Sequence, residues 1–410
     1  MTVELLTLTP DPGVVDAGST TAATLARLFS RHGVVVRGQR WVSLAEAEVD
    51  RALRHAVEGG GLVVCLGDGD GADAARQALA RLLGARLVLS DRALDALAAA
   101  YARQGRAMPR RAEALALVPR GATVLVAAPG EPGLLAEAGA TLIALLPADA
   151  GAATALATEH LLPRVAPQGA EPVTLVRTLR LVGLDLAEAA ARLDGLLRGG
   201  AAASAHPVEV GGEVWVRLAL RGPTAAAAGQ RFVELTAALR EALGPAWYGT
   251  DDERLEAVVG RLLRERGLTV ALAESCSGGL IAHRLTDIAG SSRYFERGLV
   301  VYSNAAKQTL LGVPEALLAR HGAVSAECAE AMARSVRDQA GTDLGLSVTG
   351  IAGPDGGSAA KPVGTVFIGL ADARSATVER HRFPRDREGN KALSALRGLD
   401  LLRRYCLERG

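Results

Sequence analysis

The chain has 410 residues and a formal net charge of +1, and 49% of its residues are hydrophobic while only 3% are aromatic. This length exceeds what one compact core holds, so we expect two or three domains packed mainly from Leu, Val and Ala. A net charge so close to zero gives no general attraction to nucleic acid or to an anionic membrane. The four cysteines show no CxxC spacing, which argues against a structural zinc site and against a disulfide framework.

The sequence also argues against a membrane protein. No stretch is apolar over the roughly 20 residues that a membrane-spanning helix requires. The N-terminal run MTVELLTLTP has neither the basic region nor the long apolar region of a secretory signal. We therefore expect a cytoplasmic protein.

Residues 1–168 alternate between short apolar runs and helical patterns. This alternation predicts a parallel α/β sheet with helices on both faces. The expected strands are Val3–Leu8, Val34–Arg37, Leu62–Leu66, Thr123–Ala127 and Thr141–Leu146. The expected helices are Thr21–His32, Leu44–Glu58 and Ala72–Leu83.

Residues 169–250 are predicted to form a small α+β module. Its expected elements are a strand at Val173–Leu179, helices at Leu186–Leu197 and Ala225–Leu243, and two short strands within Val208–Leu218 around Gly211–Gly212. Gly199–Ala205 has the composition of a flexible loop.

Residues 251–410 are predicted to form a further α/β unit. It starts with an amphipathic helix at Leu255–Arg266. The expected strands that follow are Val270–Ala273, Gly298–Tyr302, Leu344–Thr349 and Thr365–Ala371.

The run Ala273–Gly279 (AESCSGG) places a serine at the turn between an apolar strand and a helical pattern. Ser275 is either a helix N-cap or a nucleophile. Backbone N–H groups are unpaired at a helix N-terminus, and there they can stabilise the oxyanion of a tetrahedral intermediate. The candidate oxyanion and substrate-binding residues in this run are Cys276, Ser277, Gly278 and Gly279. Cys276 is also a competing nucleophile or, alternatively, a small buried apolar residue.

A serine nucleophile needs a base, and none of the seven histidines has a motif-like setting. Lys307 follows a strand-like stretch and the turn-forming pair Ser303–Asn304. It acts as a base only when neutral, and burial favours the neutral form of a lysine. Tyr302 is a candidate to orient this lysine or to relay a proton. The alternatives are a solvated surface lysine and a tyrosine that only packs on the strand.

The Gly-rich segment Thr349–Gly357 is a candidate ligand loop. Its four glycines allow close approach of the backbone to a ligand or phosphate, although a tight structural turn has the same composition. The candidate contacts are Thr349, Gly350 and Gly353 from this loop, together with Lys361 and the Arg385–Arg387 segment, especially Arg387, as partners of a phosphate.

Several of these segments together resemble the C-terminal domain of the competence/damage-inducible CinA family. The shared motifs are AESCSGG, GSSRYF, VYSNAAK, LGV, GAVS, VTGIAGPDGG and KPVGTV, in the family's order over residues 253–410. The resemblance implies a nicotinamide-nucleotide amidase that converts nicotinamide mononucleotide to nicotinic acid mononucleotide and ammonia without metal or cofactor. It implies Ser275 as nucleophile, Lys307 as base and Tyr302 as its helper, in a homodimer. The family usually has Thr where Ser277 stands.

The first two domains resemble the family's molybdopterin-binding-like domain and its KH-like connecting module. In some members the first domain hydrolyses ADP-ribose with a divalent metal. Its GGLGPTxDD loop appears here as Leu66–Ala74 (LGDGDGADA), and its LPGPPxE loop as Leu146–Ala152 (LPADAGA). Asp68, Asp70 and Asp73 retain carboxylates, but this spacing alone is weak evidence for a cation. We therefore expect the pyrophosphatase activity to be lost and no metal site to remain.

A second hypothesis is a competence- or recombination-associated interaction protein whose N-terminal domains dock a protein partner. Residues 170–249 contain no GXXG loop with flanking basic residues, which a KH domain uses to clamp RNA or DNA. Direct binding of nucleic acid is therefore not expected.

Overall fold

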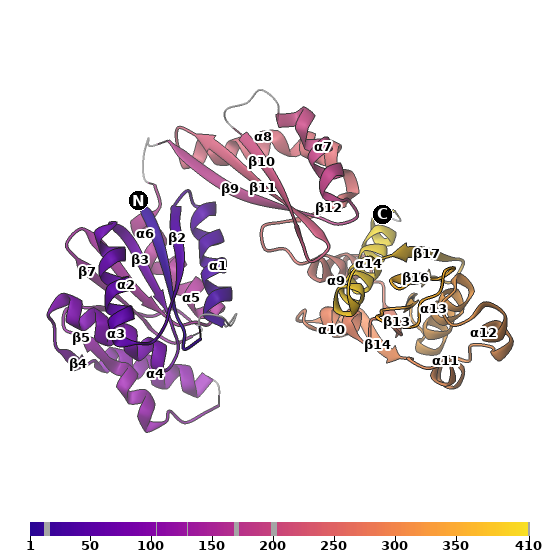
Figure 1. The fold of residues 1–410 in the computed structure, drawn as a ribbon, viewed down its shortest axis with the longest axis horizontal. Helices are drawn as coiled ribbons and strands as arrows, with labels where there is room; N and C mark the ends of the chain where they lie inside the picture. Colours follow the sequence, from indigo (N-terminus) through magenta and orange to yellow (C-terminus); the bar gives the residue numbers. More distant parts are fainter. Residues whose placement is uncertain (12–16, 104, 129, 168–171, 198–202, 409–410) are drawn as a thin grey trace. The chain divides into compact units, whose positions relative to one another are not determined.

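The computed structural model describes residues 1–410 except 12–16, 104, 129, 168–171, 198–202 and 409–410. The chain is an α/β protein, as expected, with three main sheets (Figure 1). Contacts divide it into two compact units, one mainly of residues 1–176 and 219–234, the other mainly of residues 177–200, 204–218 and 235–410. The middle sheet takes residues from both units, so domain limits at residues 168 and 250 stay a prediction.

The N-terminal sheet has six strands in the order β2-β1-β3-β8-β7-β6. Its strands are β1 (Thr2–Leu8), β2 (Val35–Val42), β3 (Gly61–Leu66), β6 (Thr123–Leu125), β7 (Gly133–Ala138) and β8 (Thr141–Leu146). The first four in the sheet order are parallel, as predicted. Strands β6 and β7 correct the prediction, because β7 runs antiparallel to both β8 and β6. Only two residues separate β7 from β8, which leaves no room for the crossover that parallel strands need.

Helices cover both faces of this sheet, as expected (Figure 1). They are α1 (Ala17–Arg31), α2 (Glu46–Glu58), α3 (Asp70–Leu83), α4 (Asp91–Arg103), α5 (Ala150–Leu156) and α6 (Leu162–Val165). Alternate residues of β1 enter different cores: Val3 and Leu5 pack with α1 and α5, whereas Leu6 and Leu8 pack with α2 and α3. A separate pair, β4 (Leu87–Leu89) and β5 (Leu117–Pro119), is antiparallel. The structure also has a 3-10 helix, η1 (Arg110–Ala116), and a π-helical turn, η2 (Ala157–Leu161).

The middle sheet has the order β10-β11-β9-β12. Its elements are β9 (Val173–Leu181), α7 (Leu186–Leu197), β10 (Ala203–Val210), β11 (Glu213–Gly222), α8 (Ala225–Leu243), the 3-10 turn η3 (Gly244–Ala246) and β12 (Trp247–Thr250). Both predicted helices have their predicted limits, and the two strands around Gly211–Gly212 are longer than predicted. Of the loop predicted at Gly199–Ala205, residues 199–202 lie outside the described residues. Ala203–Ala205 instead begin β10, so the loop prediction is wrong there.

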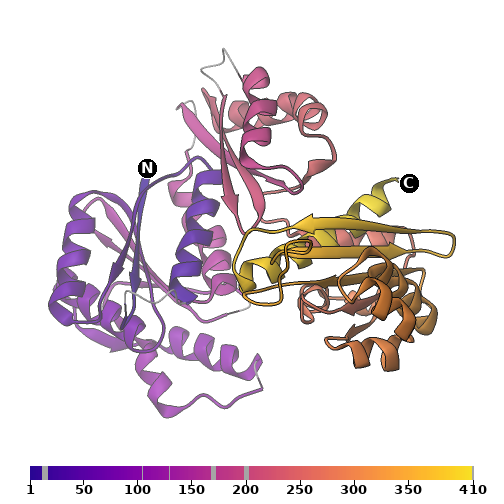
Figure 2. The ribbon, with the colours of Figure 1, turned by 45° about the vertical axis from the view of Figure 1, so that its right-hand side comes forward.

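The C-terminal sheet has five strands in the order β14-β13-β15-β16-β17. Its strands are the orange to yellow arrows in Figure 2. They are β13 (Val270–Glu274), β14 (Phe295–Val300), β15 (Leu344–Gly350), β16 (Thr365–Ala371) and β17 (Ala376–Arg382). Strands β14, β13 and β15 are parallel, and β16 is antiparallel to both of its neighbours. All four predicted strands are present. The predicted Gly298–Tyr302 instead runs from Phe295 to Val300, and β17 was not predicted.

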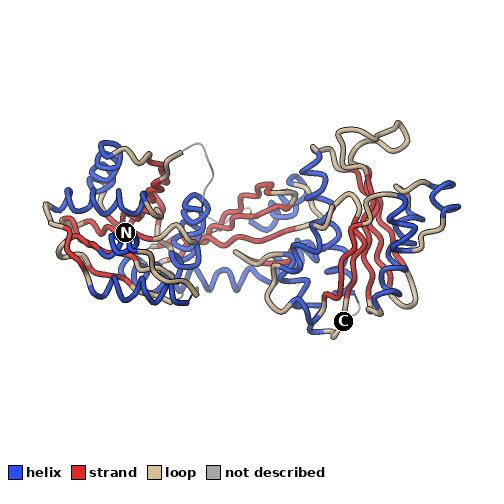
Figure 3. The backbone as a smooth tube through the Cα atoms, turned by 90° about the horizontal axis from the view of Figure 1, so that it is seen from below, coloured by secondary structure: helices blue, strands red, loops and turns tan. Residues whose placement is uncertain are grey.

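Helices pack on both faces of the C-terminal sheet (Figure 3). They are α9 (Leu255–Glu265), α10 (Leu280–Thr286), α11 (Asn304–Leu311), α12 (Glu315–His321), α13 (Ala326–Ala340) and α14 (Arg387–Glu408), with a 3-10 turn η4 (Ser291–Arg293). One core joins the sheet to α9, α10 and α14, and the other joins it to α11, α12 and α13. Which face a side chain of β13 points to therefore decides which helices it meets.

Candidate active site

The alternation of side chains along β13 separates two neighbouring polar residues. Val270 and Leu272 belong to the core with α10 and α14, and Ala271 and Ala273 belong to the core with α11 and α13. Successive side chains of a strand point to opposite faces. Glu274, the last strand residue, therefore points towards α10, and Ser275, directly after it, points towards α11.

Lys307 on α11 meets the serine. Its Nζ lies 3.0 Å from Ser275 Oγ and 2.8 Å from the carbonyl oxygen of Val301. The helix begins at Asn304, because the Ser303 hydroxyl accepts a hydrogen bond from the Ala306 N–H and caps it. Lys307 has only 1% of its surface exposed, and this burial lowers the pKa of its amine below the usual 10.5. A neutral amine can donate to Val301 and still present its lone pair to the Ser275 hydroxyl.

Glu274 was not singled out from the sequence, yet it organises the turn that carries the serine. Its buried carboxylate accepts hydrogen bonds from the N–H groups of Gly279, Ile281 and Ala282, at 3.1, 3.1 and 2.8 Å. These are N–H groups of the first turn of α10, which have no partner within the helix. The negative charge of the Glu274 carboxylate thus stabilises the positive N-terminal end of the α10 dipole.

This arrangement corrects the prediction that the N–H groups of both glycines bind an oxyanion. The Gly279 N–H already donates to Glu274, and the Gly278 N–H donates to the Ser275 carbonyl at 3.1 Å. Among the described residues, no carbonyl and no side chain of another residue accepts a hydrogen bond from the backbone N–H groups of Cys276 and Ser277. These two donors lie directly after the serine and are free for an oxygen of a ligand.

The side chains of Cys276 and Ser277 are both buried. Burial raises the pKa of the Cys276 thiol to about 11, so it is protonated near neutral pH and is a poor nucleophile. The idea that a helix N-terminus activates this thiol is therefore wrong. The Ser277 hydroxyl has no hydrogen-bond partner within the part of the chain that the structure describes.

Tyr302 lies at the rim of the site, with 56% of its surface exposed. Its hydroxyl accepts a hydrogen bond from Arg387 Nη2 at 2.7 Å, and no hydrogen bond joins it to Lys307 within the described chain. Arg387 Nη1 also donates to the Gly353 carbonyl at 2.7 Å. Arg387 thus links the tyrosine to the Gly-rich loop. No hydrogen bond among the described residues therefore supports a direct role of Tyr302 in assisting Lys307.

The other predicted loop residues are engaged in the structure itself. Thr349 is buried, and its hydroxyl donates to the Ala323 carbonyl at 2.7 Å. A Cβ added to Gly350 would lie 2.7 Å from Val366 Cγ2, so this glycine permits close pairing of β15 with β16. Lys361 Nζ donates to the His321 carbonyl at 3.0 Å. Tight packing between the strands therefore explains the glycine at position 350. This is the structural alternative to a ligand contact that the sequence left open.

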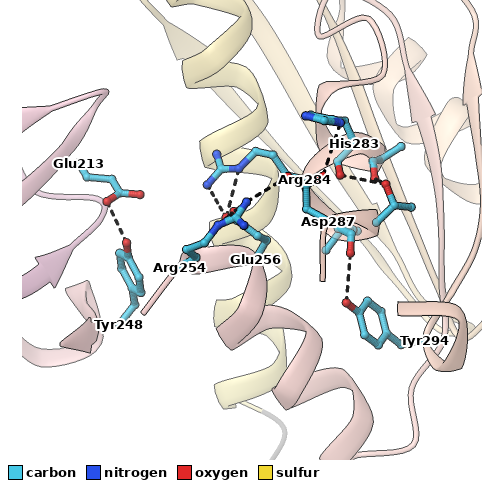
Figure 4. A network of polar contacts seen from close by, with 11 residues as sticks. Glu213, Tyr248, Arg254, Glu256, His283, Arg284, Asp287 and Tyr294 are labelled. Atoms are coloured by element: carbon cyan, nitrogen blue, oxygen red, sulfur yellow. Dashed lines mark hydrogen bonds and ion pairs between the residues drawn. The ribbon is translucent and has the colours of Figure 1, made fainter. Parts of the chain in front are cut away.

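An ion-pair network around the buried Glu256 carboxylate connects α9 to α10 (Figure 4). Glu256 on α9 pairs with Arg254 at 2.5 Å and with Arg284 on α10 at 2.7 Å. Burial alone would raise the pKa of this carboxyl, but the two guanidinium groups outweigh it and lower the pKa. The Tyr294 hydroxyl donates to the Leu285 carbonyl at 3.3 Å and so ties the far end of α10 to the sheet.

The N-terminal unit has an acidic cleft of about 710 Å³ that contains the three predicted aspartates. It is lined by Asp68, Asp70 and Asp73, and also by Glu131 and Asp149, which the sequence did not indicate. The Asp68 carboxylate accepts the Ala148 N–H at 2.7 Å, and Asp73 accepts from Gln77 at 2.8 Å. Within the described ranges, no three His, Cys, Asp or Glu side chains converge as metal ligands.

Similarity to known proteins identifies the family. Residues 252–406 match the model of the CinA C-terminal domain. A CinA-like protein of Geobacter sulfurreducens is 41% identical over 394 residues, which is 95% of this chain and 95% of that protein. The chain belongs to the CinA family. A putative competence-damage inducible protein of Symbiobacterium thermophilum is 39% identical over 405 residues, again 95% of each chain.

The resemblance to CinA drawn from the motifs is confirmed, and Ser275 and Lys307 both lie within the matched CinA domain. A solved structure of the competence/damage-inducible protein CihA from Agrobacterium tumefaciens is 39% identical to this chain. The alignment covers 36% of this chain and 91% of that one, with a TM-score of 0.36. No helix in the described part of this CinA-family chain has both the length and the apolar character to cross a bilayer.

Proposed function

We propose that the chain is an amidase that hydrolyses nicotinamide mononucleotide to nicotinic acid mononucleotide and ammonia, with Ser275 as nucleophile and Lys307 as base. The observation that carries the proposal is the 3.0 Å contact between Ser275 Oγ and a buried lysine with a lowered pKa. A hydroxyl paired with a neutral amine is an activated nucleophile. Membership of the CinA family supports the choice of a nicotinamide nucleotide as substrate, as the motif resemblance implies.

In the first half of the reaction, Lys307 accepts the proton of the Ser275 hydroxyl while Oγ forms a bond to the amide carbon. The amide oxygen becomes an oxyanion, and the free N–H groups of Cys276 and Ser277 stabilise it. When the intermediate collapses, the C–N bond breaks and the Lys307 ammonium gives its proton to the leaving nitrogen, which departs as ammonia. An acyl ester on Ser275 remains.

In the second half, a water molecule gives a proton to Lys307 and attacks the ester carbon. A second oxyanion forms and collapses, the bond from the carbon to Oγ breaks, and Lys307 returns the proton to Ser275. The product leaves as a carboxylate. The carbonyl of Val301 holds the amine in position throughout, because it accepts a hydrogen bond from Nζ at 2.8 Å.

The proposal is tested by two variants of the intact chain, Ser275→Ala and Lys307→Met. The first removes only the hydroxyl, and the second keeps the volume of the buried stem while removing the amine. Ammonia release from nicotinamide mononucleotide is expected to fall by at least about 1,000-fold in each, since nucleophile and base act as a unit. Circular dichroism checks that each variant is folded.

The matched control is Ser375→Ala. Ser375 is exposed in the turn between β16 and β17, and this turn lies at the end of the sheet away from Ser275. We expect unchanged activity in this control. Substantial ammonia release by a folded Ser275→Ala or Lys307→Met variant would reject the assignment.

A further inference from the structure

The first two turns of α14 cover the turn that carries Ser275. Residues three, four and seven apart share one face of a helix. On this face Arg387 reaches Tyr302 and the Gly353 carbonyl, and Asn390 Nδ2 donates to the Ala352 carbonyl at 3.0 Å. One turn later, Ser394 lies beside the Cys276 thiol. Lys391 is on the same face, between these contacts.

Lys391 places its ammonium directly over the backbone of the serine turn. Its Nζ lies 3.5 Å, and its Cε 3.6 Å, from the point that a Cβ on Gly278 would occupy. Because Gly278 has no side chain, the lysine can reach this close to the peptide that follows Ser277. The lysine is half-buried.

The ammonium of Lys391 has no partner among the described residues, whether carboxylate, carbonyl or hydroxyl. The other candidate cations near the site differ in this respect, and Arg385 pairs with Glu209. The guanidinium of Arg387 is used to hold Tyr302 and the Gly353 carbonyl, and Lys361 donates to the His321 carbonyl. A half-buried cation without a counter-charge is costly unless a ligand supplies the charge.

We infer that Lys391 is a specificity-determining residue that binds the phosphate of the substrate, while Arg387 is a positioning residue that holds Tyr302 and the Gly-rich loop at the rim. This inference rests on the proposed amidase function. Charge-assisted hydrogen bonds between an ammonium and a phosphate are among the stronger hydrogen bonds in proteins, and partial burial strengthens them further. Lys391 thus makes the site select a carboxamide that carries a phosphate over one that lacks it.

The experiment compares two substrates with the same carboxamide, nicotinamide mononucleotide and nicotinamide riboside, which lacks the phosphate. For Lys391→Met in the intact chain, kcat/KM for the mononucleotide is expected to fall about 10- to 100-fold, mainly through KM. For the riboside, kcat/KM is expected to stay within about twofold, because that substrate has no phosphate to lose. Lys391→Arg, which keeps the charge, should retain most of the preference.

The matched control is Arg374→Met, which removes one positive charge from an exposed position at the other end of the sheet. In this control, kcat/KM should stay unchanged for both substrates. An unchanged ratio of the two kcat/KM values in Lys391→Met would overturn the inference, and so would an equal loss of kcat for both substrates. If the wild-type chain releases ammonia from neither substrate, the proposed function fails instead.

If the wild-type chain releases no ammonia, a binding measurement still tests the phosphate site. Calorimetric titration with ribose 5-phosphate is expected to show binding to the wild-type chain and to Ser275→Ala, and at least tenfold weaker binding to Lys391→Met. Equal binding to all three proteins, or binding to none of them, would overturn the assignment of a phosphate site to Lys391.

Discussion

At the scale of single residues, the chemistry depends on the protonation of one buried amine. Lys307 must be neutral to take a proton from Ser275, and below its pKa it is charged and inactive as a base. Because burial lowers that pKa, the neutral form is populated at a lower pH than for an exposed lysine. The acid limb of the pH–rate profile is therefore a direct measure of this burial.

We expect kcat/KM for nicotinamide mononucleotide to rise with pH through a single ionisation and then to level off. The midpoint should lie below 10.5, the ordinary pKa of a lysine. Lys307→Arg should be inactive over the whole range, because a guanidinium does not lose its proton in proteins. A profile that still climbs with a midpoint at or above 10.5 would contradict a lowered pKa for this amine.

Glu274 is the second residue on which the site depends. In Glu274→Gln, one of the two acceptor oxygens becomes an NH₂ group that faces N–H donors of α10. We expect the free energy of unfolding to fall by about 2 kcal/mol, since hydrogen bonds to charged groups contribute about 1.5–3 kcal/mol. Urea denaturation measures this loss, and kcat should fall with it as the serine turn loosens.

The control for that variant is Glu296→Gln. Glu296 is an exposed residue of β14 whose carboxylate pairs only at the surface, with Arg297 at 3.2 Å. Exposed ion pairs contribute about 0–1 kcal/mol, so this change should have little effect. A Glu274→Gln variant as stable as Glu296→Gln would show that the three hydrogen bonds do not hold the turn.

The sequence named Ser275 and Lys307 but not Glu274 or Lys391, and the reason is physical. A small residue in a strand-to-helix turn and a lysine after a strand each have a local signature. The role of Glu274 depends on which face of β13 it occupies, and that of Lys391 on how α14 packs against a turn more than 100 residues earlier. Such long-range packing leaves no local pattern. In the sequence, Glu274 stands two residues after Leu272 and so on the same face of the strand. This spacing is the signal that could have indicated that the glutamate is buried.

At the scale of elements, the close packing of α13 on β15 sets the position of the strand that borders the site. A Cβ added to Gly345 would lie 2.1 Å from the Ala333 carbonyl oxygen and 2.7 Å from Arg337 Cβ. The helix backbone would have to move away from the sheet. The glycine therefore fixes the distance at which this helix packs on the strand.

Gly345→Ala is expected to lower the free energy of unfolding by about 1–3 kcal/mol, the usual cost of overpacking a core. The matched control is Gly38→Ala, also in a strand, where an added Cβ meets nothing within 4 Å. Thermal or urea unfolding of both variants provides the comparison. Equal stability of the two would show that α13 tolerates the displacement.

Strand and helix positions were mostly recoverable from periodicity, whereas strand direction and ends were not. Ala376–Arg382 has only half-buried and exposed residues at a sheet edge, so β17 lacked the apolar run that marks an inner strand. The direction of β7 followed from its short connection to β8, not from composition. The end of β14 at Val300 leaves Tyr302 outside the strand, on the exposed rim.

At the scale of the whole molecule, the two halves of the chain differ in the polar groups that they bring together. The C-terminal unit brings a hydroxyl, an amine and two free N–H groups together. In the N-terminal cleft, two of the three aspartates already accept hydrogen bonds from the protein itself. The chemistry is therefore expected to reside in the C-terminal unit alone.

Incubation of the intact chain with nicotinamide mononucleotide should release ammonia at the same rate with and without a chelator. ADP-ribose should remain intact with or without added magnesium. Product analysis by chromatography checks both expectations. Formation of AMP from ADP-ribose in the presence of magnesium would show that the acidic cleft retains a metal-dependent activity.

The alternating faces of β13 have a consequence for how this protein can change. Inserting or deleting one residue within the strand would rotate everything after it by half a turn relative to the sheet. The carboxylate would then face the amine, and the hydroxyl would face the end of α10. The strand's length in residues, not only the identity of its last members, is therefore under functional constraint.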